Sequence, residues 1–244
     1  MKKLFIFDLD NTLSESRTPV DEEIAELLCR LLEKSSVAAI SGESFQELDT
    51  QLVSRLSCGE KFERLFILPT SGGELWDFKE GEWSKVYSET IPSTARRKII
   101  AAVSVLAGIP KGRETDFIED RGGQVTYSAL GLHAPMENKT AYDPDEKKRR
   151  DFIAKIAPQF PEFSFHIGGK TSVDVTKAGV DKAFGIRKLL AYKKIAPEEA
   201  VFVGDALFEG GNDSAAKNTG VEIVETSGPE ETKKIIAEFL KNEK

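Results

Sequence analysis

Short apolar runs alternate with helical periodicity along the first third of the chain. Segments 4–7, 37–40 and 65–68 are continuous apolar runs, and such runs predict buried strands. Between them, apolar residues recur at helical spacing in segments 19–32 and 45–56. This succession of strands and helices predicts a mostly parallel sheet whose strands are joined by crossover helices.

The pattern changes in the middle of the chain, where the predicted strands alternate between apolar and polar residues. Segments 74–78 and 83–87 flank a polar tip and predict a hairpin. Alternation of this kind is typical of antiparallel strands with one exposed face. Further elements are expected as follows: strands at 117–119, 124–129, 163–167 and 172–175, and helices at 93–106 and 145–156.

The parallel pattern returns near residue 180. Helices are predicted at 182–192 and 229–240, and strands at 200–203 and 221–224. We therefore predict an α/β fold with a parallel-sheet core of residues 1–83 and 179–244, interrupted by an antiparallel α+β insertion of residues 84–178.

Composition changes this picture little but restricts the partners. The chain has 244 residues, of which 40% are hydrophobic and 31% charged, as in an ordinary globular protein. Its formal charge of −7 argues against nucleic acid and anionic membranes as partners. Cys29 and Cys58 lack a metal-ligand spacing, so we expect structural roles for them. Without a signal-like or membrane-spanning apolar segment, we expect a cytoplasmic protein.

The first predicted strand ends at two carboxylates, Asp8 and Asp10, which are followed by a turn at Asn11 and Thr12. Two carboxylates in one small site repel each other unless a cation or a shared proton compensates them. Mg²⁺ prefers oxygen ligands and is often bound by one or two carboxylates together with a substrate phosphate. The alternative is a helix cap beside a solvated acidic residue.

Three later strand or insertion ends present further reactive residues: Ser41, Lys182, and Asp205 with Asp213. Ligands of open α/β sheets collect outside the carboxyl ends of the strands. Taken singly, Ser41 and Asp213 also suit helix caps, and Lys182 an exposed helix surface. If the reaction is phosphoryl transfer, each residue has a distinct role. Asp8 is the nucleophile and Asp10 the acid/base, while Ser41 donates its hydroxyl and Lys182 neutralises charge on the phosphoryl oxygens.

These residues resemble the four motifs of the haloacid dehalogenase superfamily of phosphotransferases. The motifs are 8–12, Ser41, Lys182, and 204–205 with 211–213. The resemblance implies a Rossmann-like core, Mg²⁺ held by Asp8, Asp10, Asp205 and Asp213, Asp8 as nucleophile and Asp10 as acid/base. Asn11 stands where glycine is commoner, which we expect to alter the turn without removing the chemistry.

The insertion resembles the type IIB cap, and within that class the cap of eukaryotic-type phosphomannomutases. Segments 121–131 and 168–175 carry this similarity. It implies that Arg121 binds a distal phosphate, and that Ser172 and Asp174 meet sugar hydroxyls or that phosphate. Gly169 and Lys170 would also line the substrate site. The alternatives are a surface charge on a hairpin for Arg121 and a solvated strand face for Ser172 and Asp174. It also leaves a homodimer open.

One departure bears on the reaction. Leu132 stands where the mutases usually carry a second cap arginine, and only Lys139 or Lys170 is available to replace it. A weaker grip on a second phosphate favours water as the acceptor. We therefore expect a Mg²⁺-dependent phosphatase acting on a sugar phosphate or similar small metabolite. The alternatives are a phosphomannomutase or phosphoglucomutase, and a non-catalytic sugar-phosphate sensor.

Overall fold

The computed structural model describes residues 2–242, and the chain divides into two compact units. The first unit comprises Met1–Ser88 and Asp181–Lys244, and the second comprises Glu89–Val180. The sequence predicts boundaries at residues 84 and 178. The first boundary differs because strand β5 (Glu82–Ser88) pairs with the neighbouring strand of the first unit along its whole length.

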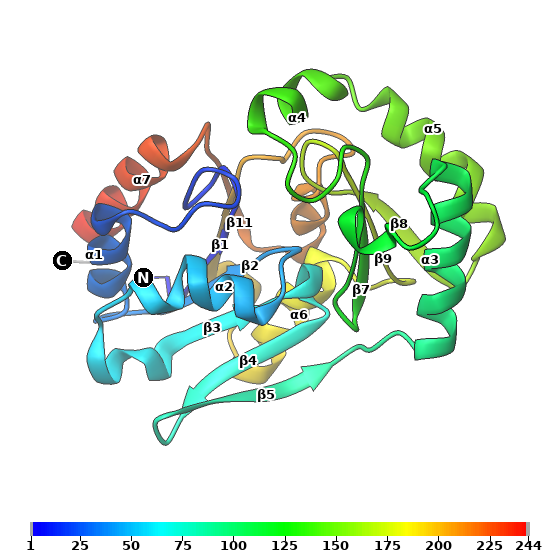
Figure 1. The fold of residues 1–244 in the computed structure, drawn as a ribbon. Helices are drawn as coiled ribbons and strands as arrows, with labels where there is room; N and C mark the ends of the chain where they lie inside the picture. Colours follow the sequence, from blue (N-terminus) through cyan, green and yellow to red (C-terminus); the bar gives the residue numbers. More distant parts are fainter. Residues whose placement is uncertain (1, 243–244) are drawn as a thin grey trace. The chain divides into compact units, whose positions relative to one another are not determined.

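The first unit is built on a seven-stranded sheet in the order β11-β10-β1-β2-β3-β4-β5 (Figure 1). The first five strands in this order are parallel, and β4 and β5 add an antiparallel hairpin. The strands are β1 (Leu4–Asp8), β2 (Ser36–Ile40), β3 (Leu65–Leu68), β4 (Glu74–Lys79), β10 (Ala200–Gly204) and β11 (Glu222–Glu225).

Both faces of this sheet are covered by helices. In β1, Phe5 and Phe7 pack with helices α1 (Glu22–Leu31), α2 (Phe45–Gln51) and α7 (Pro229–Asn242). Leu4 and Ile6 point to the other face and pack against α6 (Lys182–Lys193). Because successive strand residues alternate between faces, a strand buried on both sides must be apolar throughout, as the opening run is.

The second unit contains a four-stranded antiparallel sheet in the order β6-β7-β9-β8. Helices α3 and α5 pack on the apolar side of this sheet (Figure 1). The elements are β6 (Ile118–Asp120), β7 (Gln124–Ser128), β8 (Phe163–Ile167), β9 (Ser172–Lys177), α3 (Ser93–Ala107), α4 (Met136–Tyr142) and α5 (Lys147–Ile156). The prediction of an α/β fold with a mostly parallel sheet and an antiparallel α+β insertion is confirmed.

Two features differ from expectation. The helix predicted to reach residue 56 ends at Gln51 and continues as a short 3-10 turn, and α4 was not predicted. Cys29 and Cys58 form a disulfide, with their Cα atoms 5.1 Å apart, which agrees with the structural roles expected for them. Within residues 2–242, no helix combines the length and apolarity needed to cross a membrane.

Candidate active site

Three parallel strands bring candidate residues to one edge of the first unit's sheet. Asp8 is the last residue of β1, Ser41 follows β2, and Asp205 follows β10. β1 lies between β2 and β10 in parallel register, with Asp8 opposite Ile40. The carboxyl ends of neighbouring parallel strands coincide, so these three residues meet at the edge where open α/β sheets bind ligands.

Lys182 is buried between two of the carboxylates. It is the first residue of α6, whose start is capped by the Asp181 side chain. The Lys182 ammonium lies 2.5 Å from Asp8 Oδ1 and 2.5 Å from Asp213 Oδ1, and the residue is 2% exposed. The exposed-helix alternative for Lys182 is therefore wrong, because its charge is paired inside the site.

The loop after β10 depends on two glycines. Asp213 is fully buried, and its Oδ2 accepts a hydrogen bond from the Ala206 N–H at 3.0 Å. A Cβ atom on Gly204 would lie 2.4 Å from Asp213 Oδ2, and one on Gly211 would lie 2.1 Å from the Ala206 carbonyl oxygen. Only glycine permits so close an approach, so these residues place the Asp213 carboxylate beside Lys182.

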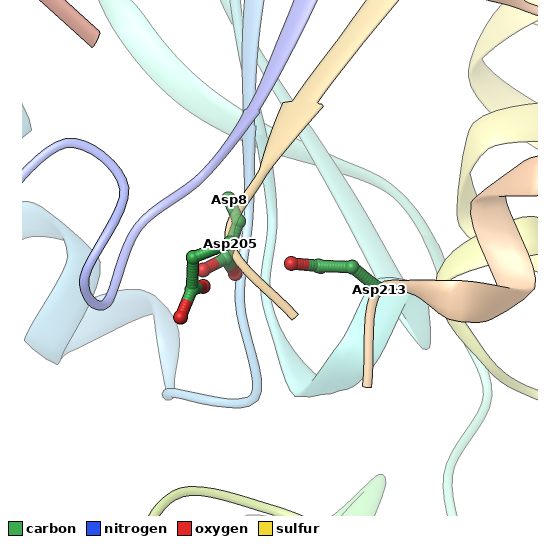
Figure 2. A group of neighbouring side chains, drawn as sticks. All are labelled: Asp8, Asp205 and Asp213. Carbon is green, nitrogen blue, oxygen red and sulfur yellow. The ribbon is translucent and has the colours of Figure 1, made fainter. Parts of the chain in front are cut away.

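Asp8, Asp205 and Asp213 form a cluster of carboxylates that fits a divalent cation. One oxygen from each lies within 4.8 Å of the others, and the Asp213 side chain points toward the other two (Figure 2). Oxygens on opposite sides of a Mg²⁺ ion are roughly 4 Å apart, since each lies about 2.1 Å from it. Three carboxylates against one ammonium leave two negative charges uncompensated. The donor set therefore suits a hard divalent cation.

Burial and mutual repulsion perturb the pKa values of this cluster. Burial raises the pKa of Asp8 well above its usual value, Lys182 opposes that shift, and Asp213 and Asp205 add to it. Burial and the neighbouring Asp213 raise the pKa of Asp205 to about 6. Burial alone would lower the pKa of Lys182, but Asp213 and Asp8 outweigh it and hold that pKa above its ordinary value. The ammonium is therefore charged, and the carboxylates lack a full complement of positive charge.

Asp10 lies in the turn beyond the strand and is half-buried. Its Oδ1 accepts a hydrogen bond from the Arg17 N–H at 2.7 Å. The carboxylate cluster does not include Asp10, whose expected role as a metal ligand stays a prediction. Asn11 adopts φ 58°, a left-handed conformation that asparagine tolerates better than most residues. The turn thus keeps a backbone conformation that glycine would also favour.

Ser41 is buried and is not the cap of the following helix. Ser44 caps α2 in a capping box with Glu47. Ser41 Oγ instead accepts a hydrogen bond from the Glu43 N–H at 3.1 Å. The hydroxyl proton of Ser41 is thus still available for donation at the edge of the sheet.

The candidate substrate residues Arg121, Gly169, Lys170, Ser172 and Asp174 all belong to the second unit. Ser172 and Asp174 lie on one face of β9, opposite Ser128 and Thr126 of β7. Gly169 and Lys170 lie in the exposed turn between β8 and β9. The sheet therefore brings Ser172 and Asp174 to one polar surface.

Three cations near the candidate substrate residues have partners within the second unit. Arg121 is paired with Glu119 at 2.7 Å, and its side chain is 3% exposed. The Lys139 ammonium donates to the Leu132 carbonyl at 2.9 Å, and the Lys170 ammonium to Thr140 Oγ1 at 3.0 Å. Glu119 therefore offsets the charge of Arg121, and hydrogen bonds hold the two ammonium groups.

Sequence reasoning missed two residues that hold Asp174. Gln124 Nε2 donates to Thr126 Oγ1 at 2.9 Å, and Thr126 Oγ1 donates to Asp174 Oδ1 at 2.7 Å. The sequence does contain a signal for these two residues. Gln124 and Thr126 are polar residues at alternate positions of a strand whose intervening residues are apolar, so both lie on the polar face of the strand.

Comparison with known families and proteins gives a consistent result. The family described as "Eukaryotic phosphomannomutase" matches residues 24–242. A phosphomannomutase of Saccharomyces cerevisiae is 28% identical, covering 97% of this chain and 94% of the yeast protein. One from Spinacia oleracea is 29% identical, covering 98% and 96% of the two chains.

Solved structures show the same fold at lower identity. A haloacid dehalogenase-like hydrolase from Bacteroides thetaiotaomicron has a TM-score of 0.66 at 16% identity, covering 98% of this chain and all of that one. An IMP-bound, N-terminally truncated IMP-nucleotidase of Plasmodium falciparum has a TM-score of 0.70 at 16% identity, covering 98% and 68%. The predicted resemblance to eukaryotic-type phosphomannomutases is confirmed by the family match, and the solved structures show that the fold is shared with haloacid dehalogenase-like hydrolases.

Proposed function

The chain belongs to the eukaryotic phosphomannomutase family, and from this premise we propose that it is a Mg²⁺-dependent phosphotransferase acting on a sugar phosphate or similar small metabolite. The observation that carries the proposal is the Lys182 ammonium, bonded to both Asp8 and Asp213 beside Asp205. A merely structural ion pair would not require a third carboxylate, that of the half-buried Asp205, at the ligand-binding edge of the sheet.

In this mechanism Asp8 is the nucleophile. Lys182 holds Asp8 Oδ1, which orients the carboxylate, and the ammonium also offsets charge on the phosphoryl oxygens. As a carboxylate oxygen of Asp8 bonds to phosphorus, the bond from phosphorus to the leaving oxygen breaks. Asp10 protonates that oxygen. In the second step Asp10 removes a proton from the incoming nucleophile, whose oxygen bonds to phosphorus as the bond between phosphorus and Asp8 breaks. Ser41 donates its hydroxyl proton to a phosphoryl oxygen.

Asp8, Asp205 and Asp213 would hold Mg²⁺, which when bound would neutralise negative charge on the phosphoryl group and on these carboxylates. The fit rests on the spacing of their oxygens and on their excess negative charge. The resemblance predicts Asp10 as a further Mg²⁺ ligand.

We favour hydrolysis as the outcome. Leu132 has an apolar side chain where a second cap arginine is expected, and Glu119 offsets the charge of Arg121. A mutase must retain a bisphosphorylated sugar while it reorients, so its cap must bind a phosphate firmly. The family membership favours the second candidate, a phosphomannomutase or phosphoglucomutase. The relatives are named as enzymes, which argues against the non-catalytic sensor.

The test is a time course with Mg²⁺ and mannose 1-phosphate, with and without catalytic glucose 1,6-bisphosphate, following both free phosphate and hexose 6-phosphate. Phosphate release that is independent of the bisphosphate is the result we expect. Hexose 6-phosphate that requires the bisphosphate would identify a mutase instead.

Asp8→Asn should reduce either activity to background, whereas the control Asp151→Asn, at an exposed position of α5, should leave it unchanged. Wild-type-like turnover by Asp8→Asn would refute the mechanism. A beryllofluoride adduct on Asp8 would separate an enzyme from a sensor, because a sensor can bind substrate without such an adduct.

Two further predictions concern assembly and location. A homodimer, implied by the resemblance, can be tested by light scattering of the purified chain. The predicted cytoplasmic location is opposed by the disulfide between Cys29 and Cys58, since disulfides are rare in reducing compartments.

A further inference from the structure

One face of the sheet in the second unit is polar although much of it is buried. Its apolar face contributes to the core beneath α3 and α5. The alternate residues of β7 and β9 carry hydroxyls, an amide and a carboxylate. They are Gln124, Thr126, Ser128, Ser172, Asp174 and Thr176. Several of these groups are bonded to one another, and a face of hydroxyl, amide and carboxylate groups presents hydrogen-bond donors and acceptors that suit a polar ligand.

The Asp174 carboxylate on this face is held in a fixed orientation. Thr126, directly opposite it on β7, donates to Asp174 Oδ1 at 2.7 Å and is itself bonded by Gln124. A Cβ atom on Gly168 would lie 2.7 Å from Asp174 Oδ2, so the glycine gives that oxygen room. An ionised carboxylate offers about four acceptor positions on its two oxygens, which suits it to a ligand that donates hydrogen bonds.

His166 of β8 is the cross-strand neighbour of Asp174 on the other side. The two residues are register partners in the antiparallel pair, so their side chains lie on the same face, with Cβ atoms roughly 5 Å apart. His166 Nε2 is buried and has no hydrogen-bond partner among residues 2–242. A buried ring nitrogen without a partner in the free protein is the position that a ligand group would satisfy.

The chemistry of this pair selects the ligand. Asp174 only accepts hydrogen bonds when ionised, whereas a neutral imidazole can accept at one nitrogen and donate at the other. A phosphate placed here would be repelled by the Asp174 carboxylate. Two adjacent hydroxyls would suit both groups, because each hydroxyl can donate and accept.

We infer that His166 is a specificity-determining residue, and that with Asp174 it binds neighbouring hydroxyls on the sugar or polyol part of the substrate. The inference rests on the proposed function, because it concerns the substrate of that reaction. His166 is thereby added to the substrate-binding residues that the family resemblance implies. The part of the ligand bound here is neutral and carries hydroxyl groups.

The experiment compares two phosphate esters in the full-length protein. Mannose 6-phosphate carries the hydroxyls, and p-nitrophenyl phosphate lacks them. His166→Phe, which keeps a ring but not its hydrogen bonds, should lower kcat/KM for mannose 6-phosphate by about 3–10-fold, the effect of one lost hydrogen bond. The same variant should change hydrolysis of p-nitrophenyl phosphate by less than about twofold, and His166→Gln should recover part of the loss.

A matched control and a set of analogues complete the design. His133→Phe, at the other and exposed histidine, should leave both esters unaffected. Among monodeoxy analogues of mannose 6-phosphate, one should be hydrolysed equally by wild type and His166→Phe, because the hydroxyl that His166 binds is missing. If His166→Phe fails to fold, as judged by circular dichroism, His166→Gln with the same analogues supplies the comparison.

Several results would overturn the inference. An equal loss on both esters would assign His166 a structural role, and no loss on mannose 6-phosphate would remove it from the site. An effect confined to glucose 1,6-bisphosphate would mean that His166 binds a phosphate. If wild type hydrolyses no ester, the proposed hydrolysis fails, and calorimetry of mannose 6-phosphate with Asp8→Asn, with and without His166→Phe, still tests His166. If Asp8→Asn does not bind mannose 6-phosphate, the inference about His166 is also overturned.

Discussion

Removing the positive charge of Lys182 should destabilise the protein as well as inactivate it. In Lys182→Met, the carboxylates of Asp8 and Asp213, each 2.5 Å from the lost ammonium, remain buried without their cation. Breaking a buried ion pair by removing one partner costs about 3–5 kcal/mol, because an uncompensated buried charge is left behind. We therefore expect the free energy of unfolding to fall by about that amount at pH 8 without metal.

The cost should depend on pH in a defined direction. Lys182 is the main influence that lowers the pKa of Asp8, so its removal should raise that pKa further above 3.8. A carboxyl whose folded pKa is raised stabilises the protein fully below its unfolded pKa, and that stability is lost as pH rises through the folded pKa. The penalty of Lys182→Met should therefore be smaller at pH 5 than at pH 8. Added Mg²⁺ should recover part of it by compensating the carboxylates.

The assay is urea unfolding of both proteins at pH 5 and pH 8, with and without Mg²⁺. Lys234→Met, the same substitution at an exposed position of α7, is the control and should change stability by less than about 0.5 kcal/mol. A penalty below about 1 kcal/mol, or one that is equal at both pH values, would refute the electrostatic reasoning.

Three further outcomes follow from the same geometry. The pKa of Asp205 is raised to about 6, so this carboxyl group is largely protonated at pH 5. Mg²⁺ binding, measured by titration calorimetry, should therefore be about tenfold weaker at pH 5 than at pH 7.5. Equal affinity at both pH values would contradict this prediction. Gly204→Ala would place a Cβ 2.4 Å from Asp213 Oδ2 and should weaken Mg²⁺ binding by roughly 10–100-fold, whereas unchanged affinity would mean that the loop adapts. Cys29→Ser should lower the free energy of unfolding by about 3–4 kcal/mol, because the disulfide to Cys58 closes a loop with a sequence separation of 29. Adding a reductant should lower the free energy of unfolding of the wild type by the same amount and leave that of Cys29→Ser unchanged. That pair of results would verify the prediction for the disulfide.

The location of the core site could be predicted from the sequence to a large extent. Asp8, Ser41 and Asp205 each follow an apolar run, and parallel strands of similar length must end at one edge of the sheet. The position of Lys182 could not be predicted in the same way, because a lysine at the start of a helix is ordinarily exposed. Its burial depends on where α6 packs and on Asp213 from a different loop.

The position of Asp8 could also be predicted from the sequence, whereas that of Asp10 could not. Equal parity predicts a shared face only while the strand continues, and the chain turns after Asp8, where the Arg17 N–H binds the Asp10 carboxylate. The disulfide was likewise hidden, because nothing in the spacing of Cys29 and Cys58 shows that α1 and a later turn approach within 5.1 Å between Cα atoms. The cross-strand pairing of His166 with Asp174 required the register of the sheet.

The sequence by itself determined the fold class, the order of the elements and the residue types available for phosphoryl transfer, because hydrophobic periodicity and strand ends are local properties of the chain. Only the tertiary structure decided which charges neutralise one another, which glycines admit a carboxylate, and which buried ring nitrogen lacks a partner. Those outcomes depend on distances of a few ångströms between residues far apart in the chain, such as Asp8 and Lys182.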